Sequence, residues 1–175
     1  MKKPLVLITG ASGFIGSKLI KYLLKNDYQI VGLTRQKNKV PNHPCLQWIS
    51  TLDELKTDQI DYVINLAGES IGKGRWTGSR KEQLIQSRVQ TTEQLYQYLN
   101  QRNIQPKRII SGSAVGFYGI DISEQWEESC TETSLPQDIF MSEHCQNWEA
   151  VTTKYPNQNT KTIRLGVVFG NGGGV

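Results

Sequence analysis

The sequence predicts an α/β protein built on a doubly wound parallel sheet, and three observations support this fold class. Short apolar runs alternate with helical patterns along the 175 residues, as in proteins made of β-α-β units. The first apolar run leads directly into three regularly spaced glycines and then into a helical pattern. The composition, with 37% hydrophobic and 21% charged residues, is ordinary for a globular protein. We therefore expect a single domain over residues 1–175, with ligands bound outside the carboxyl ends of its strands.

Each expected strand is a short apolar run between turn-forming residues. The six expected strands are Pro4–Thr9, Gln29–Thr34, Leu46–Ile49, Tyr62–Leu66, Arg108–Ser111 and Lys161–Phe169. Helices are expected over Phe14–Lys25 and Ser79–Asn100, because apolar residues recur there every three or four positions. The apolar stripes are Ile15, Leu19, Ile20, Leu23 and Leu24 in the first helix, and Ile85, Val89, Leu95 and Leu99 in the second. A third helix is expected from Phe140 to about Lys154, after a turn at residues 136–138.

A G-x-x-G-x-x-G turn joins the first strand to the first helix. Gly10 allows the tight turn, Gly13 has no Cβ to keep a pyrophosphate from the backbone, and Gly16 lets the helix pack closely on the sheet. The unpaired N–H groups and positive dipole at a helix N-terminus favour an anion. The turn therefore predicts a dinucleotide-binding Rossmann fold, the alternative being a glycine-rich turn without a ligand. The expected contact residues are Gly10, Ser12, Gly13, Phe14, Ile15 and Gly16.

The end of the second strand indicates which dinucleotide is bound. An acidic side chain there binds the adenosine ribose hydroxyls and repels a 2′-phosphate. Residues 33–39 contain no acid, and Thr34 takes its place. Arg35 follows, with Lys37 and Lys39 beyond it, so a 2′-phosphate would meet a guanidinium. These residues favour NADP(H) over NAD(H), unless they form only a solvated basic loop.

Charge and cysteine content argue against several other classes of protein. The formal net charge of +4 comes from scattered basic residues, so no nucleic-acid partner is expected. The first apolar run is too short for a signal peptide or a membrane span, and a cytoplasmic protein without membrane contact is expected. Three cysteines, Cys45, Cys130 and Cys145, are widely spaced, which is typical of reduced thiols. No Cys and His spacing fits a zinc site, and no metal is expected.

The last residues suggest that the chain is part of a longer protein. Residues 162–170 resemble a buried strand, and the glycine-rich segment Asn171–Val175 follows directly. A domain seldom ends in a flexible loop directly after a core strand. We therefore expect a further C-terminal region.

Two segments resemble the short-chain dehydrogenase/reductase superfamily, in its extended branch of nucleotide-sugar epimerase-like proteins. Thr9–Gly16 is similar to the cofactor loop of that branch, and Asn65–Gly68 to its turn after the fourth strand. Further segments resemble one subgroup, the epimerase family proteins: Gly68–Ile71, Arg75–Thr77, Arg80–Lys81, Ser87–Arg88, Gly116–Gly119, Phe140, Cys145 and Trp148–Glu149. The resemblance implies NADP binding, a C-terminal substrate lobe and a homodimer through the long helix. It also implies cofactor contacts from Asn65, Leu66, Ala67, Gly68 and Glu69.

The catalytic pair of this superfamily is missing. Its members use a Tyr that exchanges a proton with the substrate oxygen and a Lys four residues later, but no Tyr-x-x-x-Lys occurs here. The resemblance puts these two positions on Met141 and Cys145. The superfamily's serine corresponds to Ser113, with Ser111 as second choice, and would orient the substrate carbonyl. Tyr118, on the following loop, is the candidate substitute for the missing phenol, unless it only packs under that loop.

Arg75 and Trp76 form a further candidate site after the fourth strand. An Arg beside a Trp suits an anionic or planar substrate, and the alternative is a helix start with one anchoring aromatic. Two functions follow from the whole analysis. The first is an NADP(H)-dependent epimerase/dehydratase-like oxidoreductase acting on a small, sugar-like carbonyl substrate. The second is a non-catalytic NADP(H)-binding redox sensor or scaffold, which the missing Tyr and Lys favour.

Overall fold

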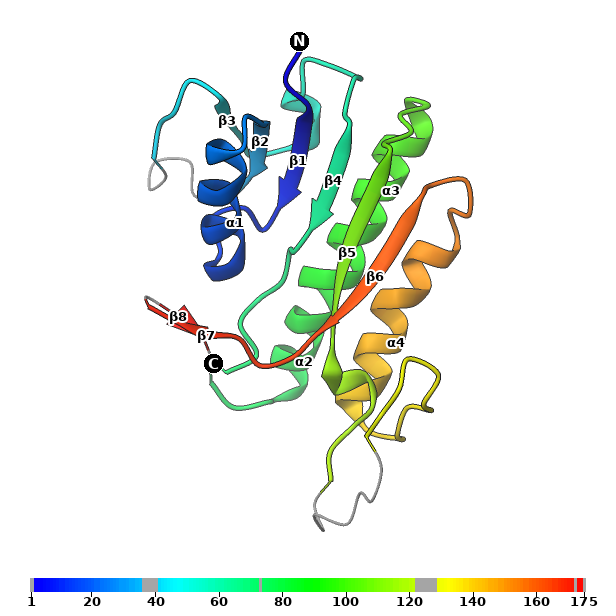
Figure 1. The fold of residues 1–175 in the computed structure, drawn as a ribbon. Helices are drawn as coiled ribbons and strands as arrows, with labels where there is room; N and C mark the ends of the chain where they lie inside the picture. The colour runs from blue at the N-terminus through cyan, green and yellow to red at the C-terminus, as the bar shows by residue number, and fades with distance from the viewer. Residues whose placement is uncertain (1, 36–40, 73, 122–128, 172, 175) are drawn as a thin grey trace.

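The computed structural model describes residues 2–35, 41–72, 74–121, 129–171 and 173–174. Within these residues one six-stranded parallel sheet has the order β3-β2-β1-β4-β5-β6 (Figure 1). Its strands are β1 (Leu5–Thr9), β2 (Gln29–Leu33), β3 (Leu46–Ile49), β4 (Tyr62–Asn65), β5 (Arg108–Ala114) and β6 (Thr160–Leu165). The predicted doubly wound parallel fold is confirmed. The strand order reverses between β1 and β4, the place where ligands bind in such sheets.

Helices cover both faces of the sheet, because successive side chains of β1 point to opposite sides. Val6 and Ile8 face α1 (Phe14–Lys25), with Ile20 and Leu23 of that helix. Leu7 faces the other layer, whose core residues include Val63, Leu95, Tyr96, Leu99 and Ile109. Helix α3 (Thr91–Gln101) lies in this second layer with α4 (Phe140–Thr153) beside it (Figure 1). The strands near the centre are therefore apolar on both faces, as parallel sheets require.

The long helix predicted over residues 79–100 contains a wider turn. Helix α2 (Gly78–Ile85) runs into a π-helical turn, η3 (Gln86–Gln90), and then into α3. A π turn adds one residue to the helix, so the buried position before it moves by one. Leu84 is fully buried, whereas Ile85 and Val89, predicted for the core face, are only half-buried. Leu95 and Leu99 lie in the core as predicted.

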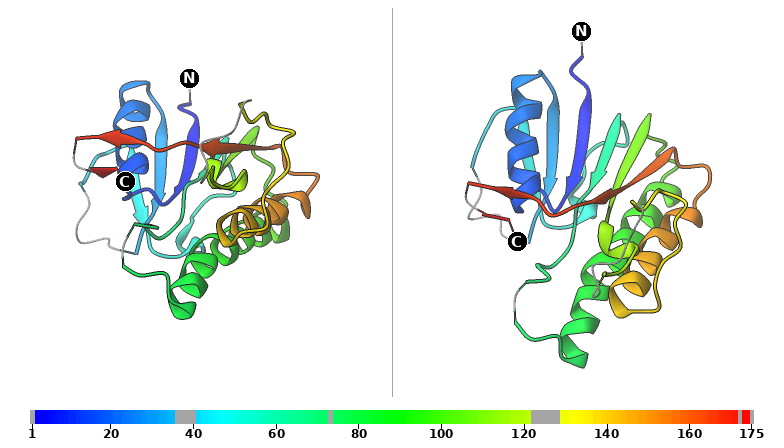
Figure 2. Two further views of the ribbon diagram at one scale, coloured as in Figure 1. Left: turned by 90° about the horizontal axis from the view of Figure 1, so that it is seen from below. Right: turned by 60° about the horizontal axis from the view of Figure 1, so that its bottom comes forward.

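Strand β6 ends earlier than predicted. Its last paired residue is Leu165, opposite Ala114 of β5. Beyond Ala114 the partner strand turns into the short 3-10 helix η4 (Val115–Phe117), so the predicted continuation to Phe169 has no neighbour to pair with. The chain instead crosses the carboxyl ends of the strands toward α1 (Figure 2) and forms β7 (Phe169–Gly170) with β8 (Gly173–Gly174).

No helix among the described residues is long and apolar enough to cross a membrane. No group of three or more His, Cys, Asp or Glu side chains in the same part of the chain is placed to hold a metal ion. Cys45, Cys130 and Cys145 are free thiols.

Candidate functional site

The glycine turn after β1 has a backbone that only glycine fits. Gly10 has φ +65°, and a Cβ there would lie 2.4 Å from the carbonyl oxygen of Leu66. A Cβ on Gly16 would lie 2.4 Å from the carbonyl oxygen of Gly10. The N–H of Gly13 donates to that same carbonyl oxygen at 2.9 Å. The turn is therefore held close to the loop after β4 and close to its own helix.

The N-terminus of α1 is shaped to receive an anion. The helix begins at Phe14, and its capping position is Gly13, which has no side chain to bond the first N–H groups. A Cβ on Gly13 would lie 3.0 Å from the carbonyl oxygen of Gly10, closer than most side chains come to such an atom. The first turn of α1 carries no acidic residue. The residues present therefore fit a diphosphate.

Ser12 and Thr34 join the glycine turn to the end of β2. Their hydroxyl oxygens lie 2.7 Å apart, and Thr34 is buried while Ser12 is exposed. The N–H of Thr34 also donates to the carbonyl oxygen of Ile49 at the end of β3. The predicted adenosine-side residues are thus held against the glycine turn.

Asn65 is buried and occupied by protein partners. Its Oδ1 accepts a hydrogen bond of 2.6 Å from Thr9, and its Nδ2 donates to Thr92 at 2.8 Å and to Ser111 at 3.3 Å. The Thr9 hydroxyl also accepts the N–H of Ala67 at 3.2 Å. The side chain of Asn65 therefore holds the ends of β1, β4 and β5 together.

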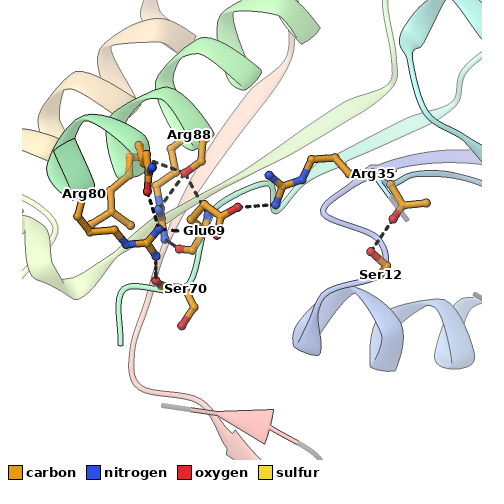
Figure 3. A network of polar contacts seen from close by, with 10 residues as sticks. Ser12, Arg35, Glu69, Ser70, Arg80 and Arg88 are labelled. Atoms are coloured by element: carbon orange, nitrogen blue, oxygen red, sulfur yellow. Dashed lines mark hydrogen bonds and ion pairs between the residues drawn. The ribbon is translucent and has the colours of Figure 1, made fainter. Parts of the chain in front are cut away.

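Glu69, in the loop after β4, lies between three arginines (Figure 3). Its Oε1 is 2.5 Å from Nη2 of Arg35, and its Oε2 is 4.0 Å from Nη1 of Arg80. Its carbonyl oxygen accepts a 2.8 Å hydrogen bond from Nη2 of Arg88, and its N–H donates to Ser87 at 3.0 Å. The sequence placed Arg35 and Glu69 in the same site without indicating that they form an ion pair.

Arg80 and Arg88 hold the loop after β4 through hydrogen bonds to its carbonyl oxygens. A Cβ on Gly68 would lie 2.9 Å from Cζ of Arg88, so this guanidinium packs directly on the glycine. Burial lowers the pKa of Arg88, whose guanidinium lies 5.5 Å from the ring of Trp148. Arg80 donates to the carbonyl oxygen of Ser70 at 2.6 Å. Arg35 differs from both because its side chain is 82% exposed.

Ser113 lies in a polar network at the ends of β5 and β6. Its hydroxyl donates to Oε1 of Glu149 on α4 at 2.6 Å. Arg164 of β6 binds both oxygens of Glu149, with two distances of 2.9 Å. Arg164 also donates from Nη1 to the Tyr118 hydroxyl oxygen at 3.0 Å. The structure thus brings both predicted catalytic residues, Ser113 and Tyr118, to the same pair of charged groups.

Sequence reasoning missed Arg164 and the role of Glu149. A signal was present, because a charged residue inside an otherwise apolar strand needs a partner, and Arg164 stands in such a run. Hydrogen bonds with the Glu149 carboxylate are the main cause that raises the pKa of Arg164. A permanently charged guanidinium therefore lies beside both hydroxyl groups.

The contacts set the hydrogen-bonding sense of the two hydroxyl groups. A hydroxyl has one hydrogen and two lone pairs. Ser113 gives its hydrogen to Glu149 and is only 2% exposed, so a ligand that reached it would meet an acceptor. Tyr118 uses a lone pair for Arg164, so this contact leaves its hydrogen for a ligand. The sequence analysis expected Ser113 to orient a substrate carbonyl, and here its hydroxyl hydrogen is bonded to Glu149.

Met141 and Cys145 occupy one face of α4, against the loop after β5. A Cβ on Gly116 would lie 3.3 Å from Cε of Met141 and 3.8 Å from Sγ of Cys145. Cys145 is fully buried, and burial raises the pKa of its thiol. A thioether and a protonated thiol therefore stand where the superfamily resemblance implies a phenol and an amine.

Arg75 and Trp76, the candidate substrate contacts, lie exposed in the segment before α2. Trp76 donates from Nε1 to the carbonyl oxygen of Ile71 at 3.0 Å, and its ring meets that of Phe140 edge to face at 5.8 Å. Arg75 is exposed. These contacts match the alternative interpretation, in which Trp76 anchors the start of α2 to α4.

A cavity of about 360 Å³ lies between α3 and the ends of β2 and β3. Its walls include Leu33, Thr51, Gln94 and Tyr98. The glycine turn, Ser113 and Tyr118 do not line it. The cavity is thus separate from the predicted catalytic residues.

Comparisons with known proteins agree with this architecture. Residues 6–174 match the model of the NAD dependent epimerase/dehydratase family. The epimerase family protein SSP1921 of Staphylococcus saprophyticus is 36% identical over 173 residues, which cover 96% of this chain and 56% of that protein. A similar protein of Staphylococcus aureus, SAOUHSC_00792, is 36% identical over 174 residues, again 56% of its length. The chain thus spans about half the length of the curated relatives it matches.

Solved structures show the same fold. Human epimerase family protein SDR39U1, crystallised with NADPH, superposes with a TM-score of 0.79 at 27% identity, covering 97% of this chain and 56% of the human chain. A nucleoside-diphosphate sugar epimerase from Corynebacterium glutamicum gives 0.75 at 30% identity, covering 99% and 36%. The expected resemblance to epimerase family proteins is confirmed. Because the family pattern extends over nearly the whole sequence, from β1 to the segment after β6, the chain belongs to the NAD dependent epimerase/dehydratase family.

Proposed function

We propose that the chain binds NADP(H) and contains the cofactor site of an epimerase/dehydratase-type oxidoreductase. The observation that carries the proposal is the bare helix N-terminus at Gly13, with the exposed guanidinium of Arg35 at the end of β2. The human relative in complex with NADPH supports the choice of NADP(H). A UDP-glucuronic acid 4-epimerase from Bacillus cereus was crystallised with NAD, but at 22% identity it supports the fold alone.

The chain offers matching groups along the edge of the sheet. The first N–H groups of α1, from Phe14 and Ile15, would hold the diphosphate, because they precede any intrahelical bond. Ser12 and Thr34 would hold the adenosine ribose, and Arg35 would bind the 2′-phosphate. The backbone of Ala67 and Gly68 would close the site from the β4 side. Leu66 and Glu69 belong to the same loop, where Leu66 already contacts the glycine turn.

The bound cofactor would supply or accept hydride. For a small, sugar-like carbonyl substrate, Tyr118 would donate a proton or hydrogen bond to the carbonyl oxygen. Ser113 would accept a hydrogen bond from a neighbouring substrate hydroxyl, as the observed sense of its bond to Glu149 favours. Arg75 remains a candidate contact for an anionic part of the substrate because it is exposed.

A second function is favoured by one observation. Met141 and Cys145 replace the proton-exchanging pair, so the chain could bind NADP(H) without turnover and serve as a redox sensor or scaffold. Hydride exchange between bound NADPH and any carbonyl compound of a broad panel would support the oxidoreductase. Tight nucleotide binding with no exchange across that panel would support the non-catalytic protein.

Nucleotide titration tests the cofactor proposal. Energy transfer from the four tryptophans to bound NADPH or NADH reports binding directly. We expect NADPH to bind more tightly, and Arg35→Asp to weaken NADPH binding by about 10- to 100-fold, since a charge-assisted phosphate bond is lost. NADH binding should change by less than about threefold, because NADH has no 2′-phosphate.

Lys56→Asp is the matched control, because Lys56 is exposed in the connection before β4. It should leave both affinities unchanged. Failure of both nucleotides to bind the wild-type chain, or an equal loss of both in Arg35→Asp, would contradict the proposal.

A further inference from the structure

The loop after β4 supplies a carboxylate, Glu69, to the place where the acidic residue expected after β2 is missing. Arg35 stands where a 2′-phosphate would be bound, yet its Nη2 lies 2.5 Å from Oε1 of Glu69, a residue 34 positions later in the chain (Figure 3). Glu69 follows β4, and β1 separates β4 from β2 in the sheet. A 2′-phosphate at Arg35 would therefore meet a negative charge from Glu69, which the residues next to Arg35 in the sequence do not reveal.

The two partners of this ion pair differ in how firmly they are held and in how exposed their side chains are. Glu69 is fixed through its main chain, because its N–H donates to Ser87 and its carbonyl oxygen accepts from Arg88. Its side chain is 27% exposed, whereas that of Arg35 is 82% exposed. The backbone that carries the carboxylate is thus held in place, and the guanidinium is the more exposed partner, which can turn toward a ligand.

The other arginines of the cluster are not equivalent to Arg35. Arg88 is packed between Gly68 and Trp148. The side chain of Arg80 is only 16% exposed and donates to the carbonyl oxygen of Ser70. Neither can reach outward as Arg35 can, so a phosphate that approaches this surface competes with Glu69 for one guanidinium.

We propose that Glu69 is a specificity-determining residue whose carboxylate competes with the 2′-phosphate of NADP(H) for Arg35. This inference rests on the proposed function, since it assumes that the 2′-phosphate binds at Arg35. An exposed ion pair is weak, so NADPH displaces it, but breaking the pair with Glu69 offsets part of what the phosphate gains at Arg35. Glu69 therefore narrows the preference for NADPH over NADH.

The test is a thermodynamic cycle on the full chain, with NADPH and NADH as the probes. Wild type, Glu69→Gln, Arg35→Gln and the double variant are titrated by tryptophan energy transfer. We expect Glu69→Gln to tighten NADPH binding by about fivefold and to change NADH binding by less than about twofold. In the Arg35→Gln background the same substitution should change NADPH binding by less than about twofold, because no guanidinium is left to compete for.

Glu82→Gln is the charge-matched control, since Glu82 is exposed on α2 and its carboxylate contacts Gln86. It should leave NADPH binding unchanged, which excludes a general effect of net charge. Glu69→Asp is the second variant in case Glu69→Gln unfolds. It keeps the charge, shortens the reach toward Arg35, and should give a smaller gain in NADPH affinity.

The possible failures are distinguishable. Unchanged or weaker NADPH binding in Glu69→Gln, equal gains for both nucleotides, or a full gain in the Arg35→Gln background would overturn this inference and leave NADP(H) binding in place. Absence of binding of both nucleotides to the wild type would overturn the proposed function and this inference together.

Discussion

Tyr118 and Ser113 sit at the two ends of one network. Arg164 donates to Tyr118, and Glu149 accepts from Ser113 while binding Arg164 through both oxygens. The ion pair is largely buried, with 19% and 17% of its two side chains exposed. Fully bonded buried pairs of this kind hold their neighbours in one orientation. The network therefore presents a donor at Tyr118 and an acceptor at Ser113.

Substitution of these two hydroxyl residues should affect catalysis unequally. Tyr118→Phe removes the proton donor, and we expect turnover of NADPH with a responsive carbonyl substrate to fall by about 100-fold or more. Ser113→Ala removes an acceptor together with the hydrogen bond to Glu149, and a loss of about tenfold is expected. Steady-state kinetics would measure both losses, and NADPH affinity should stay within about twofold of wild type.

Tyr155→Phe is the control for loss of a phenol, because the Tyr155 hydroxyl donates to Glu93, away from this network. It should retain full turnover. Full turnover in Tyr118→Phe would show that Tyr118 is not the donor.

At the scale of elements, Thr92 ties one helix to its neighbours. Its hydroxyl oxygen accepts from Nδ2 of Asn65 at 2.8 Å and from Nε1 of Trp148 at 2.9 Å. All three residues are buried. Helix α3 is thereby joined to β4 on one side and to α4 on the other, which aligns the site loops that follow β4 with the helix that carries Glu149.

Thr92→Val should destabilise the fold although it keeps the side-chain shape. Two buried N–H donors lose their acceptor, and each such loss costs about 1–3 kcal/mol. We expect the free energy of unfolding to fall by about 2–6 kcal/mol in urea denaturation. Thr153→Val, at an exposed position of α4, should change it by less than about 0.5 kcal/mol. A similarly small effect of Thr92→Val would show that the bonds are not needed for stability.

The sequence predicted these elements well where periodicity alone decides them. Helix α1 has the predicted bounds, and every predicted strand is present within a few residues. The π turn could not be predicted, because no residue type in Gln86–Gln90 is specific for such a turn. Packing against the sheet decides that Leu84 rather than Ile85 is buried. The early end of β6 depends on where its partner strand turns away, which a pattern within one segment cannot show.

The candidate site was predictable only in part, for a related reason. The glycine turn is local, so its spacing was readable directly. The partners of Ser113 and Arg35 lie 36 and 34 residues away, and both are set by the order of strands. Contacts between side chains so far apart in the sequence can be identified only from the three-dimensional arrangement of the strands.

At the scale of the whole molecule, His144 links stability to pH. It is buried between α4 and the long helix, with its ring stacked on Phe140 at 5.9 Å. Neither ring nitrogen has a hydrogen-bond partner in the part of the chain that the structure describes. Burial, with a smaller effect of Arg88, lowers its pKa from 6.5 to about 4.

We expect stability to decrease as the pH falls from about 6.5 to about 4. In this window the unfolded chain binds a proton at this histidine and the folded chain does not, so protons favour unfolding. The full loss is on the order of 3 kcal/mol. Asp27, Asp61 and Glu93, whose pKa values are lowered by hydrogen bonds to lysines, lose their contributions at still lower pH.

Urea denaturation at several pH values would measure this slope. His144→Leu should remove it between pH 6.5 and 4. His43→Gln, a change of the other histidine at an exposed position, should keep it. An unchanged slope in His144→Leu would assign the pH dependence to other groups.

The Arg35–Glu69 pair spans the centre line of the sheet, because β2 and β4 lie on opposite sides of β1. Segment exchange between relatives is simplest in the connection between Ile49 and Tyr62, which joins the two halves. A chimaera made there would inherit the glycine turn and Arg35 from one parent and Glu69 from the other. Under the proposed competition at Arg35, nucleotide preference would not transfer with the first half alone, because the chimaera would also need a compatible residue at position 69.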